Sequence, residues 1–247
     1  MRKNDAPALG DIPAALGLLT RLPAFGAAPR GAVAAWAYPL AGMVIGLIAG
    51  CAGLITLWAG LPAPLAALVT LTTQIALTGA MHEDGLADSV DGLWGGWTRA
   101  RRLEIMKDSH IGAFGVIALI LSLSARWAAL WLLFQHGNAL AAIIVAAALS
   151  RAALPALMRA LPHARGAGLS HGVGRPAWRI VGWAVGVAAI AAVVLLGWSG
   201  IGAILWALIA TIAVGWIAQA KIGGQTGDIL GAAQQVAEIA VLLSIIA

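Results

Sequence analysis

Long apolar segments recur along almost the whole of this 247-residue chain and constrain its fold more than any other feature. A helix that crosses a bilayer needs about 20 predominantly apolar residues. Segments of this kind lie at roughly 32–58, 62–80, 111–135, 138–160, 177–197, 200–220 and 229–246. Charged residues make up only 10% of the chain, whereas a soluble chain carries about a quarter. The sequence therefore predicts an all-α, polytopic membrane bundle of about seven transmembrane helices.

The connections between these segments indicate how the bundle is oriented. Connections near 59–63, 135–138 and 197–200 are short and uncharged, whereas those at 81–110, 159–179 and 221–228 are rich in charge. Alternation places the charged connections and the N-terminus on one side. The positive-inside rule makes that side cytoplasmic. The net charge of +5 suits an anionic leaflet or a phosphorylated substrate, and we expect no nucleic acid partner.

The first 30 residues differ from the rest of the chain. Leu9, Ile12, Leu16 and Leu19 recur at helical spacing, which favours a short amphipathic helix that lies in the membrane interface. We therefore divide the chain into an interfacial segment, 1–30, and a single transmembrane catalytic domain, 31–247.

Acidic residues concentrate between positions 82 and 108, where six of the ten carboxylates of the chain lie. In a helix, Asp84, Asp88 and Asp91 would share one face. Glu104 and Asp108 repeat the i, i+4 spacing. Clustered carboxylates suit a hard cation, and Mg²⁺ held in this way also holds phosphates. We predict a magnesium site made by these five residues at the cytoplasmic border.

Two simpler interpretations of the acidic segment remain open. It could be a solvated loop in which Arg99, Arg101, Arg102 and Lys107 neutralise the acids, and Asp108 could cap the helix that follows. Within the spans, Arg126 and Arg151 need a polar partner, for which Glu238 is the obvious candidate. A structural ion pair and a role in binding substrate phosphate are both open for these arginines.

A second motif, Ile222-Gly-Gly-Gln-Thr-Gly-Asp228, stands directly before the last span. Glycines let backbone N–H groups approach an anion at a helix N-terminus, and Thr226 or Asp228 could cap that helix. His82 adjoins the acidic segment, whereas His110, His136, His163 and His171 show no ligand spacing and are interpreted as loop or interface residues.

These motifs together resemble one family. The stretches His82-x-Asp-Gly-Leu-Ala-Asp-x-x-Asp-Gly92, Leu103–Ser109 and Gly223–Ala232 are similar to those of cobalamin synthase, also called adenosylcobinamide-GDP ribazoletransferase. The resemblance runs from about residue 18 to the C-terminus. Glu83 departs from it, because the family usually has an apolar residue there. Other aspartate-motif membrane phosphotransferases or prenyltransferases, or a small-molecule transporter, are the alternatives.

The resemblance implies a multi-pass enzyme of the bacterial inner membrane with its active site facing the cytoplasm. It would transfer adenosylcobinamide phosphate from adenosylcobinamide-GDP to α-ribazole, or to α-ribazole 5′-phosphate, and release GMP with Mg²⁺ present. Asp108, Glu104 and His82 are the candidate catalytic residues. The candidate substrate-binding residues are Arg21, Arg102, Lys107, Arg151, Gly224, Gln225, Thr226 and Asp228. A homo-oligomer is compatible with these expectations.

Overall fold

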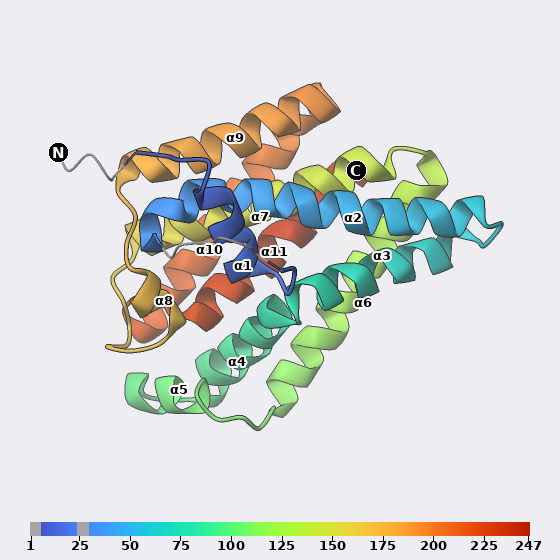
Figure 1. The fold of residues 1–247 in the computed structure, drawn as a ribbon. Helices are drawn as coiled ribbons and strands as arrows, with labels where there is room; N and C mark the ends of the chain where they lie inside the picture. The colour runs from blue at the N-terminus through green and yellow to red at the C-terminus, as the bar shows by residue number, and fades with distance from the viewer. Residues whose placement is uncertain (1–5, 24–29) are drawn as a thin grey trace.

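The computed structural model describes residues 6–23 and 30–247, and within these ranges the chain is helical and contains no strand. A short 3₁₀ helix, Gly31–Ala37, precedes the second α-helix (Figure 1). The helices are α1 Asp11–Leu19, α2 Tyr38–Trp58, α3 Ala63–Thr78, α4 Met81–Gly95, α5 Arg99–Ile105, α6 Ala113–His136, α7 Ala139–Ala160, α8 Leu169–Val173, α9 Trp178–Leu196, α10 Trp198–Ile222 and α11 Gly227–Ile246.

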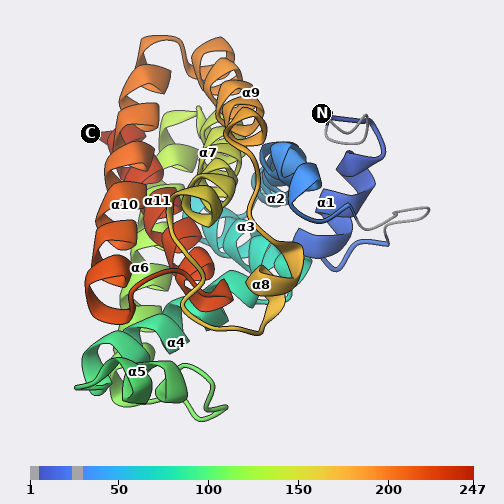
Figure 2. The ribbon, with the colours of Figure 1, turned by 90° about the vertical axis from the view of Figure 1, so that its left-hand side faces the viewer.

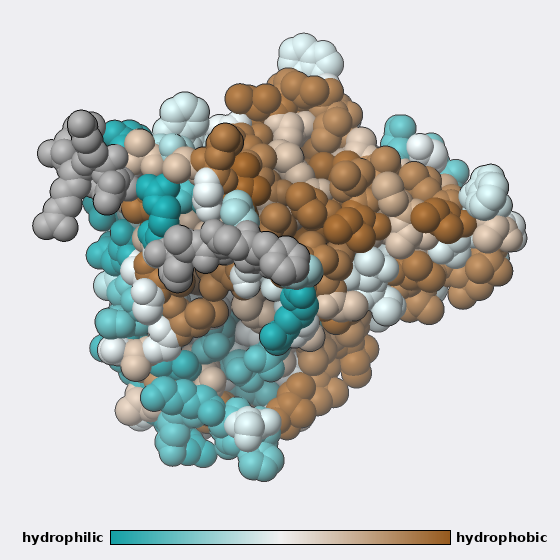
Figure 3. Space-filling view, in the orientation of Figure 1, coloured by the Kyte–Doolittle hydropathy of each residue, from teal (hydrophilic) through white to brown (hydrophobic). Residues whose placement is uncertain are grey.

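Within the described residues, six helical segments are long and apolar enough to cross a membrane, and α3 with α4 makes a seventh if the pair is one bent span. This confirms the predicted polytopic helical fold. Hydrophobic residues cover much of the bundle, and hydrophilic residues gather at the end where α4, α5 and α8 lie (Figure 3). Figure 2 shows this polar end from the front; α8 packs there against α11 and the 3₁₀ helix.

The central helix α7 packs directly against α2 because two glycines remove side chains from the contact. A Cβ atom at Gly42 would collide with the carbonyl oxygen of Ala147, and one at Gly46 would lie 2.8 Å from the Cα of Ile144. Small residues four apart permit such close backbone contact in membrane helices. The core of the bundle is therefore built largely from backbone and small side chains.

The second predicted span, 62–80, differs from the structure. Helix α3 ends at Thr78 after 16 residues, and α4 then begins at Met81 with its axis turned by 86°. Gly79 and Ala80 make this bend with φ angles of 63° and 58°. Left-handed backbone suits glycine and is strained for alanine. The acidic segment after residue 80 is thus a helix that leaves the bundle core toward its polar end.

Candidate active site

Helices α4 and α11 touch through two glycines, and this contact brings their acidic residues together. A Cβ atom at Gly85 would lie 2.9 Å from the carbonyl oxygen of Asp228 and 3.1 Å from the Cα of Gly231. Asp84 and Asp88 flank Gly85 on α4. The absence of side chains at this crossing therefore lets carboxylates from two distant parts of the sequence share one site.

The electrostatics of the site are dominated by negative charge. Half-buried Asp88 lies in the field of Asp84, Asp228 and Asp91, and Arg165 is the cation that opposes them. Arg165 forms an ion pair of 3.1 Å with Asp228. Carboxylates held close together in a partly desolvated site attract a cation, either a metal ion or a cationic group of a substrate.

A cavity of about 370 Å³ opens beside these aspartates, and we call it the first cavity. Asp84 and Asp228 line it together with His82, His163 and His171. Its remaining polar residues come from α8 and from the segments before α8 and α11, and its apolar residues come from α1, α2, α4, α7, α8 and α11. A second cavity, of about 480 Å³, adjoins it and is lined by Arg21, Thr20, Thr78 and Gly79.

The Gly-rich motif shapes one wall of the first cavity. Gly223 ends α10 with a φ angle of 72°, and a Cβ atom at Gly224 would collide with the Pro162 carbonyl oxygen. The glycines thus serve the turn and its contact with the segment after α7. The Gln225 amide nitrogen donates to Nδ1 of His163 at 2.8 Å, and its oxygen accepts a hydrogen bond from Ser170.

The predicted cap of the last helix is present. The Thr226 hydroxyl oxygen accepts a hydrogen bond of 3.2 Å from the Ile229 backbone nitrogen, so Thr226 is the N-cap of α11. The Thr226 hydroxyl also donates to Asp228 at 3.2 Å. This bond helps to hold the Asp228 carboxylate at the rim of the first cavity.

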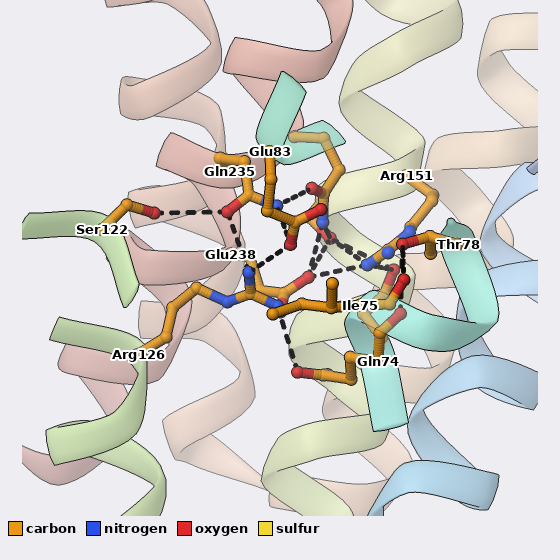
Figure 4. Close-up of polar contacts among 12 residues, drawn as sticks. Gln74, Ile75, Thr78, Glu83, Ser122, Arg126, Arg151, Gln235 and Glu238 are labelled. Atoms are coloured by element: carbon orange, nitrogen blue, oxygen red, sulfur yellow. Dashed lines mark hydrogen bonds and ion pairs between the residues drawn. The ribbon is translucent and has the colours of Figure 1, made fainter. Parts of the chain in front are cut away.

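A buried polar network connects α4 to α6, α7 and α11 (Figure 4). Arg126 of α6 pairs with Glu83 at 2.7 Å and with Glu238 of α11 at 3.0 Å, and Arg151 of α7 pairs with Glu238 at 2.7 Å. Gln235 bonds to both Arg126 and Glu83. Two arginines and two glutamates balance in charge, which is what a dry interior requires.

This network contains the structural ion pair that was one of the two roles left open for the arginines. Glu238 is the partner of both, and Arg151 is only 2% exposed. The guanidinium of Arg151 is thus engaged in an ion pair, and its predicted contact with substrate phosphate stays a prediction. The departure at Glu83 also has a structural explanation, since its carboxylate provides the second acidic partner of Arg126.

Asp91, predicted as a metal ligand, makes two backbone hydrogen bonds that the sequence did not predict. Its two oxygens accept hydrogen bonds from the backbone nitrogens of Gly112 at 2.7 Å and Gly115 at 2.9 Å. These donors belong to the first turn of α6, which has no intrahelical acceptors. Asp91 thus caps α6 from the neighbouring helix, and Asp108 does not cap it.

Glu104 and Asp108 lie apart from the α4 aspartates and are exposed. Glu104 pairs with Arg101 at 2.8 Å, and Asp108 pairs with His110 at 2.6 Å. The hydrogen bond from His110 holds the pKa of Asp108 below its ordinary value. The predicted five-carboxylate set is therefore not one cluster here. No group of three or more His, Cys, Asp or Glu side chains in the described residues is arranged around a common metal position.

Of the other basic residues predicted to bind substrate, one makes structural hydrogen bonds and two are exposed. The guanidinium of Arg102 donates to the backbone carbonyl oxygens of Gly96 and Lys221, both at 2.9 Å, and so ties α5 to α10. Lys107 is exposed at the polar end, and exposed Arg21 lines the second cavity. Among these three basic residues, Arg21 is the one that shares a cavity with an aspartate of the site, Asp84.

Three residues of the site were missed from the sequence. The sequence predicts His163 and His171 to be loop or interface residues and places Arg165 in the charged connection 159–179, yet all three line the first cavity. The rings of His163 and His171 lie 5.1 Å apart. The only sequence signal was their place in a charged connection on the same side as the aspartates.

Fold and site together define a polytopic membrane protein with an acidic, histidine-lined cavity at the polar end of a helical bundle, an arrangement suited to a polar substrate that reaches the membrane surface. The model of the cobalamin-5-phosphate synthase family matches residues 11–246. The chain belongs to this family and is a membrane transferase of cobalamin synthesis.

Relatives support the assignment over the whole chain. The chain is 44% identical to the adenosylcobinamide-GDP ribazoletransferase of Bradyrhizobium diazoefficiens, with 95% of this chain and 92% of the relative covered. It is 44% identical to the enzyme of the same name from Azorhizobium caulinodans, with 96% of each covered. For the Brucella ovis enzyme the identity is 41%, over 100% of this chain and 99% of the relative. No solved structure matches.

Proposed function

We propose that the chain transfers adenosylcobinamide phosphate from adenosylcobinamide-GDP to α-ribazole, or to α-ribazole 5′-phosphate, and releases GMP. Relatives that cover almost the whole chain carry the name of this reaction. The single structural observation that carries the proposal is the meeting of Asp84 and Asp228 at the first cavity, with Asp84 also lining the second cavity and Asp88 within the field of both aspartates. Such a site can accept two substrates and act on phosphate groups between them.

The site would face the cytoplasm of a bacterial cell at the inner membrane. The charged connections after α4, α7 and α10 lie at the polar end of the bundle with the aspartates (Figure 1). The connections after α2, α6 and α9 are short and uncharged. By the positive-inside rule the polar end is cytoplasmic, where nucleotide substrates are available.

The reaction forms one bond and breaks one bond at phosphorus. A ribose hydroxyl oxygen of the acceptor attacks the phosphorus that bears cobinamide, and the bond from that phosphorus to the bridging oxygen breaks, so GMP leaves with the bridging oxygen. The hydroxyl proton passes to a carboxylate of the site, for which Asp228 stands at the cavity rim. Positioning and charge neutralisation supply most of the catalysis in such transfers. Arg21 in the second cavity would bind the diphosphate.

The donor groups of the site fit Mg²⁺, which we propose as the cofactor. Mg²⁺ is usually bound through one or two carboxylates together with substrate phosphates and waters, and it seldom needs a cage made by protein alone. Asp84, which lines both cavities, and Asp88, which lies in its electrostatic field, would hold it. When bound, it would neutralise the negative charge of the diphosphate.

Two substitutions test this assignment against the broader set predicted from sequence. Asp88→Asn should abolish GMP release by the purified protein while the protein still inserts and unfolds at the wild-type temperature. Glu104→Gln is the matched control, since Glu104 is an exposed carboxylate paired with Arg101, and it should retain activity. Full activity in Asp88→Asn, or loss only in Glu104→Gln, would contradict the proposed site.

A further inference from the structure

The first cavity has an apolar floor beneath its polar rim. Five helices contribute side chains to this floor. The side chains are those of Leu19, Tyr38, Met81, Leu154, Met158 and Leu230. We infer that this cavity binds the acceptor nucleoside, with the apolar bicyclic base of α-ribazole on the floor and its ribose at the rim beside Asp84. The inference rests on the proposed function and assigns one of its two substrates to a place.

The size of the first cavity limits which part of the two substrates it can enclose. Its volume of about 370 Å³ is at the lower end of the range for pockets that enclose one small ligand. A nucleoside is a ligand of that size, whereas a corrin ring with its side chains is several times larger. The cavity can therefore enclose either the ribazole acceptor or the guanosine part of the donor, but not the cobinamide.

The chemistry of the floor favours ribazole over guanosine. Guanine has hydrogen-bond donors and acceptors along its edges, and burying these against leucine and methionine side chains is costly unless partners replace water. The benzimidazole base of ribazole presents an apolar ring at the same position. Met81 and Met158 suit such a ring because thioethers pack adaptably against aromatic faces.

The distribution of charge also places the nucleoside in the first cavity and the diphosphate in the second. Arg165 in the first cavity is already paired with Asp228 at 3.1 Å. In the second cavity Arg21 lies against Gly79, and among the described residues it forms no ion pair. A guanidinium without an acidic partner attracts phosphate oxygens. The diphosphate therefore belongs to the second cavity, and the nucleoside belongs to the first.

His82 is only 2% exposed, and its buried Nε2 atom has no hydrogen-bond partner among the described residues, so it gives a ligand little surface to contact. The ribose is placed instead where the two cavities meet, beside Asp84. Asp84 and Met81 line both cavities, so a ribose held there would face the phosphates.

The test compares two neighbouring residues of α7. Met158 lies on the cavity floor, whereas Leu157 packs against α10, where a Cβ atom at Gly215 would meet its Cδ2 atom at 2.8 Å. Met158→Ala should raise the KM for α-ribazole by about tenfold or more and leave the KM for adenosylcobinamide-GDP unchanged. The control Leu157→Ala should change neither KM. A rise in the KM for the donor in Met158→Ala, or no change in either KM, overturns the inference.

A binding measurement on the wild-type protein keeps the two proposals separate. Saturation-transfer NMR in detergent should detect α-ribazole without donor, and GMP should not displace it. Displacement by GMP overturns the inference even if Met158→Ala fails to fold. If α-ribazole binds in this way but the complete mixture yields no GMP, the proposed function is wrong and the nucleoside site stands.

Discussion

Replacing Glu238 with glutamine tests how the buried network holds α4 in the bundle. The Glu238 carboxylate is fully buried and accepts bonds from Arg126 at 3.0 Å and Arg151 at 2.7 Å. Glutamine keeps the shape but removes the charge, so two buried arginines share the single carboxylate of Glu83. Breaking a buried ion pair by removing one partner costs about 3–5 kcal/mol. We expect the free energy of unfolding to fall by that amount.

The assay is thermal unfolding of the detergent-purified protein followed by tryptophan fluorescence. The loss corresponds to a decrease in Tm on the order of 10 °C for a chain of this length. Glu83→Gln should cost less, since Arg126 then keeps its bond to Glu238. Adding Arg151→Met to Glu238→Gln should restore part of the loss, because it removes the excess positive charge. An unchanged Tm in Glu238→Gln, or strictly additive losses in the double variant, would refute this reasoning.

Three further predictions follow from particular contacts. Gly85→Ala places a Cβ atom 2.9 Å from the Asp228 carbonyl oxygen, so it should destabilise the protein by about 1–3 kcal/mol and slow GMP release. Gly186→Ala, where nothing lies within 4 Å, is its control, and equal effects of the two would contradict the close contact of α4 and α11. Asp91→Ala should lower the free energy of unfolding by about 1–2 kcal/mol through loss of the α6 cap. The Mg²⁺ concentration for half-maximal activity should not change, and a large shift would make Asp91 a metal ligand instead. Burial, with the charges of His171 and Arg175, lowers the pKa of His163 below 6.5, so the unfolded chain binds more protons just below that pH. The stability contribution of neutral His163 should be complete above pH 6.5 and decline on acidification toward the lowered pKa. The measurement is Tm against pH for wild type and His163→Phe. Identical pH profiles of the two proteins would contradict this contribution of His163.

The fold was largely predictable because its signal is local. Each apolar run long enough to span a bilayer became a helix, and the helical spacing of Asp84, Asp88 and Asp91 matches their place on α4. The bend at Gly79 and Ala80 is not predicted, because no charged residue or proline lies between Leu65 and the bend. The sequence shows where a helix can form, but the direction of its axis is decided by packing.

The site was less predictable because helical spacing does not identify the neighbour of each residue. Asp88 and Asp91 share a face of α4, yet Asp91 meets the first turn of α6 whereas Asp88 faces the field of Asp228. Glu104 found a partner three residues away in Arg101. Arg165 belongs to an irregular segment, and only tertiary structure brings it to Asp228.

The most direct test of the account is release of GMP by the purified protein supplied with adenosylcobinamide-GDP, α-ribazole and Mg²⁺. The account predicts release only when both substrates are present, loss of release on chelation of the metal, and recovery when Mg²⁺ is added back. Release of GMP that persists in the chelator at the full rate would contradict the proposed acidic site at Asp84 and Asp88.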